Sequence, residues 1–494
     1  MVIKVSHPYI LAIDEGTTNA KAITIDPQGL ILSKGSQPVT LSHPFPGWAQ
    51  QDPQAIWQAT LQAVEQSVAH LPLEQLSGIA ISNQRESVLI WERKTGRPLT
   101  PVVSWQCRRS EQICQEIADK PGAKQIKALT GSVLDPLFPA SKIVWLLRDL
   151  ENGFERALAG ELCVGTVDTW LVWKLTGGKS YVTDYSNASR YQLFNIHRLS
   201  WDPLLLELFG IPVQCLPEVI PSCGERGVTC QCDVLPDGIP IHAQIGDSHA
   251  ALYGQGGYQF GVVKATYGTG SSLMTSVESD DLSDASVSTT VAWHDGKPRL
   301  ALEGNITHTG AAIQYMARLL GAFDVNTLSE MAWSVDGNSG VYFIPALAGL
   351  GAPHWKPQAK GVIGGLTDAA TPEVLARAAF ESIAYQIADL FFAMQDATDH
   401  PLAQLWVDGG PTKNRNLMQF QADLLQVPLV KNNLAEVSAL GAGYLAGKSL
   451  GWWKTYQELS DLPRSVEIIQ PNPKSESIQA SYRRWKDLIH KACL

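Results

Sequence analysis

The sequence lacks several features that mark large classes of proteins. Its 494 residues contain no block of basic residues and carry a formal net charge of −10. Binding to nucleic-acid backbones relies on clustered Lys and Arg, so a nucleic-acid partner is not expected. No apolar run reaches the roughly 20 residues of a membrane-spanning helix. Residues 1–8 contain no signal-peptide apolar region, and we therefore expect a cytoplasmic protein without a membrane partner.

Cysteine pairs and low-complexity tracts are also missing. Eight cysteines are scattered along the chain, which favours free thiols in a reducing compartment. Cys223, Cys230 and Cys232 lie close together in sequence. Their spacing lacks the paired Cys-x₂₋₄-Cys and His ligands of a structural zinc site, so the sequence argues against zinc.

Two common catalytic motifs are absent as well. Ser248 and His249 follow Asp247, but there is no Gly-x-Ser-x-Gly segment, and adjacent side chains rarely converge on one point, so a serine hydrolase is not favoured. Residues 439–449 nearly match a phosphate-binding P-loop, but Ala442 stands where its first glycine would be. We interpret 439–449 as a small-residue helix that packs closely on a neighbour.

The sequence does contain apolar runs that alternate with amphipathic segments, a pattern that predicts an α/β class. Residues 77–82 read as a buried strand. Asp52 and Pro53 predict the start of a helix before it. The apolar stripe of this helix consists of Trp57, Leu61, Val64, Val68 and Leu71. A second long helix is predicted to begin at Thr371-Pro372.

A glycine-rich segment, residues 253–261, marks a predicted domain boundary. We expect one domain at 1–253 and another at 254–494. Each contains an apolar strand followed by a Gly-Thr turn, at Gly16-Thr17 and Gly268-Thr269. This is a weak internal echo of a duplicated nucleotide-binding fold.

Three glycine turns follow apolar strands. They are Asp14-Glu15-Gly16-Thr17-Thr18, Tyr267-Gly268-Thr269-Gly270 and Asp408-Gly409-Gly410. The backbone N–H groups of such turns, with threonine hydroxyls, can hold phosphate oxygens. Each could instead be an ordinary hairpin turn, but two of them after buried strands favour phosphate binding. Asp247 lies between the first two turns in sequence, and a lone carboxylate among phosphate turns is typical of phosphoryl transfer.

Polar side chains follow two further predicted strands. Arg85 and Glu86 follow residues 77–82, and Trp105 follows Val102-Val103. The C-terminal ends of strands face the ligand crevice of an α/β sheet. Arg85 and Glu86 could therefore bind hydroxyls as donor and acceptor, and Trp105 could lie against a carbon skeleton. Sequence pattern alone favours a simpler alternative, a surface ion pair and a core tryptophan.

Together and in this order, these motifs resemble the FGGY family of carbohydrate kinases, and glycerol kinases in particular. The matching segments are residues 13–18, 47–48, 83–86, 105–109, 166–170, 183–190, 246–247, 266–270, 310–314, 349–353 and 407–410. The resemblance implies a duplicated actin-like ATPase (ribonuclease H-like) fold, with two domains around a cleft. It also implies ATP with Mg²⁺ and a small polyol or sugar substrate, and it leaves a homo-oligomer open.

The resemblance also implies roles for individual residues. Asp247 would be the general base that takes the proton from the attacking hydroxyl, and Asp14 would act near the metal. The substrate would be held by Arg85, Glu86, Trp105, Leu137, Asp247, Ser248 and Ser272. The nucleotide would be held by Thr17, Thr18, Lys21, Thr269, Gly310, Gln314, Gly410 and Asn414.

The chain departs from glycerol kinases at three of these positions. Leu137 stands where they usually carry tyrosine, Ser248 where they carry glutamine, and Ser272 where they carry phenylalanine. The pocket should be roomier, so a four- or five-carbon polyol or sugar is as well supported as glycerol. Some bacterial glycerol kinases have a fructose-bisphosphate site that contains a Gly-Gly-Thr-Arg segment. This chain lacks such a segment, so regulation by fructose bisphosphate is not expected.

Three alternatives stay open from the sequence. They are a strict glycerol kinase that makes glycerol 3-phosphate, a non-catalytic actin-like ATP-binding sensor, and an ATP hydrolase of the same superfold. A sensor would not need Asp247, Arg85 and Glu86 together, so their joint presence argues against it.

Overall fold

The chain forms two compact units. The computed structural model describes residues 8–278, 286–356, 358–433 and 436–492. The first unit consists of Met1–Tyr258, Thr289–Ala301 and Glu436–Pro463, and the second of Gln259–Ser288, Leu302–Ala435 and Arg464–Leu494. Residues 1–7, where we expect no signal peptide, lie outside the described residues. No helix in the described ranges is long and apolar enough to cross a membrane.

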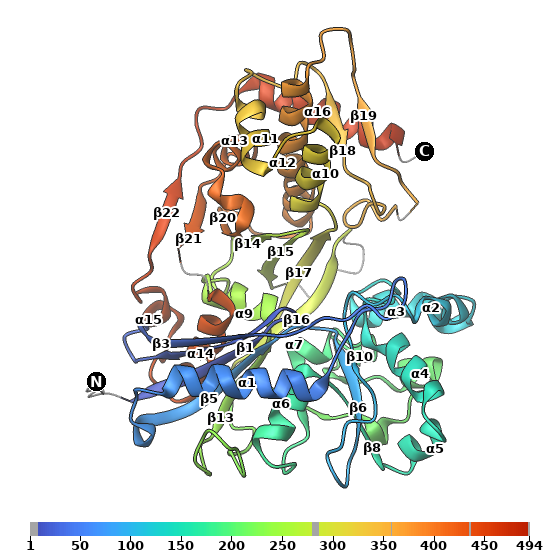
Figure 1. Cartoon of the computed structure of the whole chain (residues 1–494), viewed down its shortest axis with the longest axis vertical. Helices are drawn as coiled ribbons and strands as arrows, with labels where there is room; N and C mark the ends of the chain where they lie inside the picture. Colours follow the sequence, from blue (N-terminus) through green and yellow to red (C-terminus); the bar gives the residue numbers. More distant parts are fainter. Residues whose placement is uncertain (1–7, 279–285, 357, 434–435, 493–494) are drawn as a thin grey trace. The chain divides into compact units, whose positions relative to one another are not determined.

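The first unit is built on a five-stranded sheet in the order β13-β5-β1-β2-β3 (Figure 1). Its strands are β1 (Tyr9–Glu15), β2 (Asn19–Ile25), β3 (Ile31–Pro38), β5 (Leu76–Asn83) and β13 (Ile241–Gly246). β1 and β2 form an antiparallel hairpin, β5 runs parallel to β1, and β13 runs parallel to β5. The strand predicted at 77–82 is confirmed as part of β5.

Helix α1 (Pro53–Val68) covers one face of this sheet. It begins where the sequence predicts, because the Asp52 carboxylate accepts a hydrogen bond of 2.9 Å from the Gln54 N–H. The predicted stripe is buried in one cluster with Leu11 and Ile13 of β1, although its last residue, Leu71, lies beyond the end of the helix at Val68. The predicted amphipathic helix is therefore confirmed.

Helix α14 (Val437–Ser449) covers the other face. A Cβ on Gly443 would come within 3.4 Å of the Cβ of Ala12, and successive residues of a strand point to opposite faces. A Cβ on Gly441 would lie only 1.8 Å from the Ala250 carbonyl oxygen in α9 (Asp247–Gly254). The prediction of a small-residue helix that packs closely on a neighbour is confirmed.

Smaller elements complete the first unit. A four-stranded sheet has the order β4-β7-β6-β8. The remaining strands are β4 (Gln50–Gln51), β6 (Val88–Glu92), β7 (Val102–Val103), β8 (Leu162–Thr166), β9 (Val182–Asp184), β10 (Phe194–Asn195), β11 (Ser200–Trp201), β12 (Glu218–Ile220) and β16 (Ser288–His294). The remaining helices are α2 (Glu111–Ala118), α3 (Gln125–Thr130), α4 (Pro139–Asp149), α5 (Gly153–Leu158), α6 (Val167–Leu175), α7 (Tyr185–Ala188), α8 (Pro203–Phe209) and α15 (Tyr456–Ser460).

The second unit repeats the plan of the first. Its sheet contains the order β17-β15-β14-β20-β21-β22. The strands are β14 (Val262–Tyr267), β15 (Ser271–Val277), β17 (Pro298–Ile306), β18 (Tyr342–Ile344), β19 (Val362–Gly364), β20 (Gln404–Gly409), β21 (Leu429–Asn432) and β22 (Val466–Ile469). As in the first unit, a hairpin with a Gly-Thr turn, β14–β15, is followed by two strands that extend the sheet in parallel, β20 and β21. This shared strand order shows the duplicated fold, for which the sequence gives only the repeated Gly-Thr turn as a weak signal.

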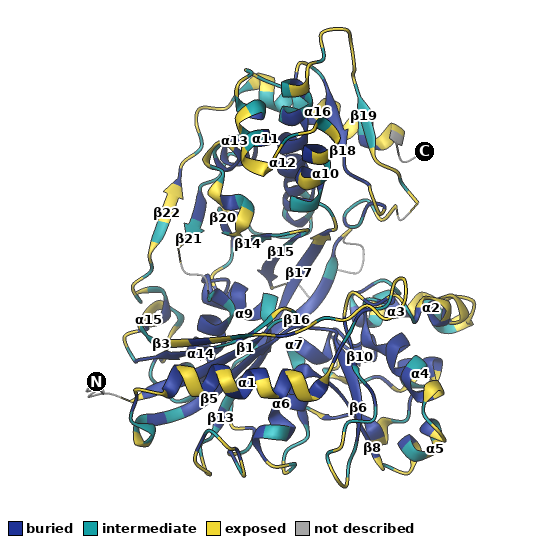
Figure 2. Ribbon diagram, viewed as in Figure 1, coloured by how far each residue is buried: buried dark blue, intermediate teal, exposed yellow. Residues whose placement is uncertain are grey.

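Helices pack around the second sheet. They are α10 (Gly310–Leu320), α11 (Val325–Trp333), α12 (Pro372–Asp396), α13 (Arg415–Leu425) and α16 (Glu476–Ala492). The predicted start of α12 is confirmed, because the Thr371 hydroxyl accepts a 3.4 Å hydrogen bond from the Val374 N–H. Figure 2 shows that α12 is buried along most of its length, as expected for a central helix of a core.

Candidate active site

In the first unit, three parallel strands end at the same edge of the sheet. Glu15 of β1 and Gly246 of β13 both pair in register with Asn83, the last residue of β5. The residues that follow these strand ends therefore lie together. This register brings Asp14, Arg85, Glu86 and Asp247 to one place, although they lie far apart in sequence.

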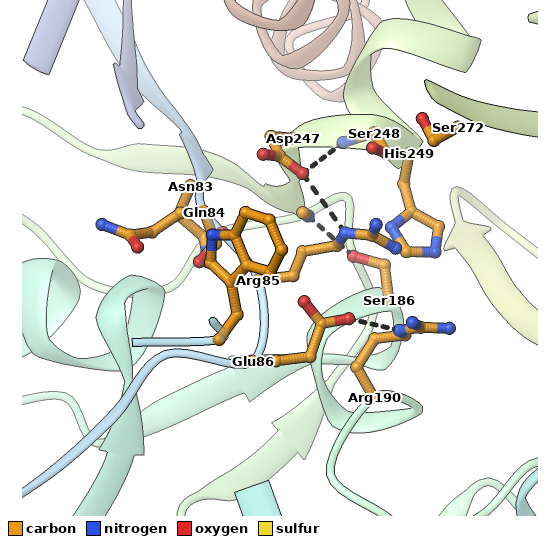
Figure 3. A network of polar contacts seen from close by, with 12 residues as sticks. Asn83, Gln84, Arg85, Glu86, Ser186, Arg190, Asp247, Ser248, His249 and Ser272 are labelled. Atoms are coloured by element: carbon orange, nitrogen blue, oxygen red, sulfur yellow. Dashed lines mark hydrogen bonds and ion pairs between the residues drawn. The ribbon is translucent and has the colours of Figure 1, made fainter. Parts of the chain in front are cut away.

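Asp247 is held by the arginine that follows β5. Arg85 Nε donates to Asp247 Oδ1 at 3.2 Å, and the Ser248 N–H donates to the same oxygen at 2.6 Å (Figure 3). The Arg85 side chain is 9% exposed, whereas 38% of the Asp247 side chain is exposed. Gly246 makes the approach possible, since a Cβ there would lie 2.6 Å from Arg85 Cδ. The arrangement presents one oriented carboxylate to the outside.

Glu86 is buried and has a strained backbone. Its φ is +60°, a region that non-glycine residues rarely adopt and that is often retained at functional sites. Glu86 Oε1 accepts a 2.6 Å hydrogen bond from Nε of Arg190, whose side chain is 2% exposed. The simpler alternative of a surface Arg85–Glu86 pair is wrong, because each residue is buried against a partner elsewhere in the chain.

Trp105 is not a core tryptophan, since 38% of its surface is exposed. Its indole Nε1 donates to the Thr17 hydroxyl at 3.0 Å, and its backbone N–H donates to the Ser87 hydroxyl at 3.1 Å. Ser87 in turn donates to Gln84 Oε1 at 2.8 Å. These hydrogen bonds link Thr17, which lies in the first predicted phosphate turn, to Trp105 and the predicted sugar-binding segment that contains Arg85 and Glu86.

Two acidic residues close strand β1. Ser82 donates to Asp14 Oδ1 at 2.7 Å, and burial, opposed by this bond, raises the pKa of Asp14 to about 6. Glu15 is fully buried, and burial raises its pKa to about 8 despite the hydrogen bond from Gln84. One Glu15 oxygen, Oε1, has no hydrogen-bond partner within the part of the chain that is described. Thr18 is exposed, and Lys21 pairs in register with Asp14.

The state of Glu15 gives a stability prediction for Glu15→Gln. Its folded pKa of about 8 exceeds the unfolded value of 4.5, so its contribution to stability is present at low pH and is lost as pH rises through 8. Glutamine keeps an oxygen for Gln84 and removes the buried charge. We expect the variant to melt several degrees above the wild type near pH 9 and close to it near pH 5, in calorimetry without metal or nucleotide.

The control for this prediction is Glu65→Gln, which changes an exposed carboxylate of α1. This variant should show the same small difference at both pH values. A Glu15→Gln variant whose melting temperature differs from wild type equally at both pH values would contradict the buried-charge argument.

Leu137 and Ser248 are both partly exposed. Ser248 follows Asp247 in the first turn of α9, while Leu137 lies just before α4. The Leu137 N–H donates to Asp135 Oδ1 at 2.7 Å, and its carbonyl accepts from Lys142 Nζ. The role of these two side chains as a wall of the substrate pocket stays a prediction.

In the second unit, the turn at 268–270 docks on the start of α10. The Gly310 N–H donates to the Gly268 carbonyl at 3.0 Å, and the Ala311 N–H donates to the Thr269 carbonyl at 3.0 Å. A Cβ on Gly310 would lie 2.5 Å from the Gly268 oxygen, so glycine is needed there. Thr269 and Gly310 are therefore brought together at a helix N-terminus, a position that favours anions. Gln314 is exposed one turn further along α10.

The third glycine turn follows β20 in the same unit. Gly409 has a φ of +99°, and a Cβ on it would lie 1.9 Å from the Tyr267 carbonyl oxygen. Gly410 begins the short helix that leads to Asn414, which caps α13 by accepting from the Leu417 N–H at 3.0 Å. Asn414 Nδ2 also donates to the Ser329 hydroxyl at 2.8 Å. Because β20 pairs with β14, Gly409 lies beside the turn at 268–270.

Ser272 lies in β15, where its hydroxyl accepts from the buried Lys264 Nζ at 3.0 Å. It belongs to the second unit, whereas the other six predicted substrate residues belong to the first. The sequence assigned no role to Gln84, Arg190 or Lys264. Gln84 and Arg190 lie inside segments that match the family pattern, which is the signal that could have identified them.

The chain is similar to known proteins along nearly its whole length. Models of the FGGY family of carbohydrate kinases match the chain, the N-terminal domain at residues 9–254 and the C-terminal domain at residues 263–450. An apulose kinase of Pectobacterium atrosepticum is 55% identical over 489 residues, which is 99% of each chain. Glycerol kinase 2 of Thermotoga maritima is 42% identical over 98% of each chain. The crystal structure of Plasmodium falciparum glycerol kinase with ADP superposes with a TM-score of 0.91 at 29% identity and 99% coverage of both chains.

Proposed function

Because the chain belongs to the FGGY family of carbohydrate kinases, we propose that its substrate is a five-carbon sugar of the apulose class. The chain is an ATP-dependent carbohydrate kinase with an α/β two-domain actin-like fold. The 55% identical relative is named as an apulose kinase. The smaller side chains at Leu137, Ser248 and Ser272, compared with glycerol kinases, support a substrate larger than glycerol.

The observation that carries the catalytic part of the proposal is the Arg85–Asp247 pair at the strand ends. A buried guanidinium holds one oxygen of a carboxylate whose side chain is 38% exposed. Such a carboxylate is oriented before the substrate arrives and stays accessible to a hydroxyl proton. General-base catalysis requires this combination of fixed geometry and access.

Glu86 and Trp105 complete the proposed sugar site. The Arg190 bond orients the Glu86 carboxylate, which accepts hydrogen bonds from sugar hydroxyls when ionised. The partly exposed indole of Trp105 is fixed by Thr17 and offers an apolar face to a carbon skeleton. These residues bind and orient the sugar, and Asp247 takes the proton of the attacking hydroxyl.

As the family resemblance implies, the nucleotide would be held by the glycine turns and the residues near them, namely Thr17, Thr18, Lys21, Thr269, Gly310, Gln314, Gly410 and Asn414. Mg²⁺ fits Asp14, since magnesium is usually bound by one or two carboxylates together with substrate phosphates. The described residues contain no group of three His, Cys, Asp or Glu side chains that could hold a metal without such phosphates. When bound, Mg²⁺ neutralises charge on the β- and γ-phosphates. The oligomeric state and the cytoplasmic location stay predictions.

Release of ADP from ATP tests the proposed function. We expect little release without a sugar, and the highest kcat/KM with apulose in a panel that also contains glycerol, erythritol, ribitol, xylitol, xylulose and ribulose. Phosphorus NMR should show a sugar phosphate rather than free phosphate. Equal release with and without sugar would instead support the ATP hydrolase, ATP binding without turnover would support the sensor, and the highest kcat/KM for glycerol would support the strict glycerol kinase.

A further inference from the structure

A lysine that the proposed chemistry does not use is buried beside the sugar-binding segment. Lys142 lies in the first turn of α4, and its side chain is completely buried. Lysine is almost never fully buried without a partner, because removing an ammonium group from water is costly. A buried lysine at this place therefore requires an explanation.

Lys142 has one hydrogen-bond acceptor among the described residues, the backbone carbonyl of Leu137. No carboxylate lies within ion-pair distance of it in the described ranges. Burial accordingly lowers the pKa of Lys142 to about 8, although Glu86, Cys107, Asp135 and Cys114 favour its charged form. The ammonium group is thus buried in a low-dielectric environment, where it donates a hydrogen bond to the Leu137 carbonyl.

Leu137 is hydrogen-bonded through both its carbonyl and its N–H group. The Leu137 carbonyl accepts from Lys142, and the Leu137 N–H donates to Asp135 Oδ1 at 2.7 Å. Asp135 is itself held by Arg108, whose Nη1 lies 3.5 Å from Asp135 Oδ1. Two charged side chains therefore fix the backbone on either side of one leucine.

The segment that carries Leu137 continues into the Glu86 site. The next residue, Phe138, lies with its ring 4.9 Å from the Arg190 guanidinium carbon, and Arg190 holds Glu86 at 2.6 Å. The Ala140 N–H also donates to the Tyr191 carbonyl at 3.0 Å. Movement of the Leu137 backbone would therefore reach the proposed sugar site through Phe138 and Arg190.

We propose that Lys142 is a positioning residue that sets the sugar preference of the enzyme by fixing the backbone of Leu137, an inference that rests on the proposed function. Lys142 does not touch the reacting atoms. It acts through Leu137, and Asp135 acts in the same way from the other side.

The test compares Lys142→Met with the wild type. Methionine fills a similar volume and removes a buried charge, so the variant should fold and its melting temperature should not fall. The measured quantity is the ratio of kcat/KM for the best sugar to that for glycerol. We expect this ratio to fall about tenfold or more, mainly through KM of the sugar, because even one methylene more or less in a pocket changes discrimination by about 10–200-fold. KM for ATP should stay unchanged.

The control is Lys120→Met, which changes an exposed lysine. Lys120 Nζ also donates to a backbone carbonyl in the first unit, that of Leu208 at 2.7 Å, at a place with no predicted substrate residue. This variant should leave the ratio unchanged. Asp135→Ala, which frees the Leu137 N–H, should lower the ratio as Lys142→Met does. It also supplies the test if Lys142→Met does not fold.

A double-mutant experiment with Leu137 distinguishes a positioning role of Lys142 from a general structural role. In a Leu137→Ala background, Lys142→Met should no longer change the ratio, because residues that act through one group are not additive. A ratio that is unchanged in Lys142→Met, or that falls equally in the Leu137→Ala background, overturns the inference. A wild type that phosphorylates no five-carbon sugar overturns the proposed function instead, and the inference with it.

Discussion

Replacing Asp247 by asparagine is expected to lower kcat by about 10²–10⁴-fold, the usual contribution of a general base. The affinity for ATP should stay nearly unchanged. Asparagine keeps the shape of the side chain and an oxygen that can accept from Arg85 Nε and the Ser248 N–H, which lie at 3.2 and 2.6 Å. An amide cannot take the proton of the attacking hydroxyl. Steady-state kinetics on the best sugar, together with calorimetric titration of a non-hydrolysable ATP analogue, measure both quantities.

Asp52→Asn is the matched control for this variant. Asp52 also accepts a backbone hydrogen bond at the start of a helix of the first unit, and asparagine caps helices as well as aspartate does. Its turnover should match the wild type. If Asp247→Asn also turns over within a few-fold of the wild type, Asp247 is not the base.

The triple variant Leu137→Tyr, Ser248→Gln and Ser272→Phe is expected to move preference from a five-carbon sugar toward glycerol. The added phenol, amide and ring fill volume and supply contacts to a three-carbon substrate. Each such change in a pocket is worth roughly 1–3 kcal/mol of discrimination. We expect the ratio of kcat/KM between the best sugar and glycerol to fall by roughly 10–100-fold or more.

The structure adds a control that the sequence does not suggest. Ser272 accepts a hydrogen bond from buried Lys264 at 3.0 Å, so Ser272→Phe changes a buried contact as well as the pocket. The double variant Leu137→Tyr, Ser248→Gln leaves Lys264 untouched and should give part of the shift without loss of stability. The enlarged-pocket argument fails if glycerol is already the best substrate of the wild type, or if neither variant changes the ratio.

Local features of the fold could be predicted from the sequence because their causes are local. The Asp52 cap and most of the stripe that follows it lie within α1. The small residues of 439–449 show that a second helix, α14, must pack closely on its neighbours. The Gly-Thr turns directly follow the strands that they end. In each case the residues that determine the element lie within one or two turns of chain, and the structure confirms the prediction.

The state of the candidate site could not be predicted, because it depends on contacts between distant segments. Neighbouring Arg85 and Glu86 are typical of a solvated surface, yet β-sheet register buries them, and their partners lie 162 and 104 residues away. Trp105 looks like a core residue, but its indole bonds Thr17, 88 residues away. Lys142 carries no sequence signal, since its position at the start of an amphipathic helix is also compatible with solvent.

The position of α14 in the first unit has a consequence for the order of folding during synthesis. One face of the central sheet, at Ala12, is covered by a helix that begins at Val437. The ribosome must therefore make nearly the whole chain before the sheet of the first unit can close its core. Until then an apolar face stays uncovered, a condition that favours aggregation of nascent chains and recruits chaperones. A segment synthesised late, Glu436–Pro463, thus completes the first unit.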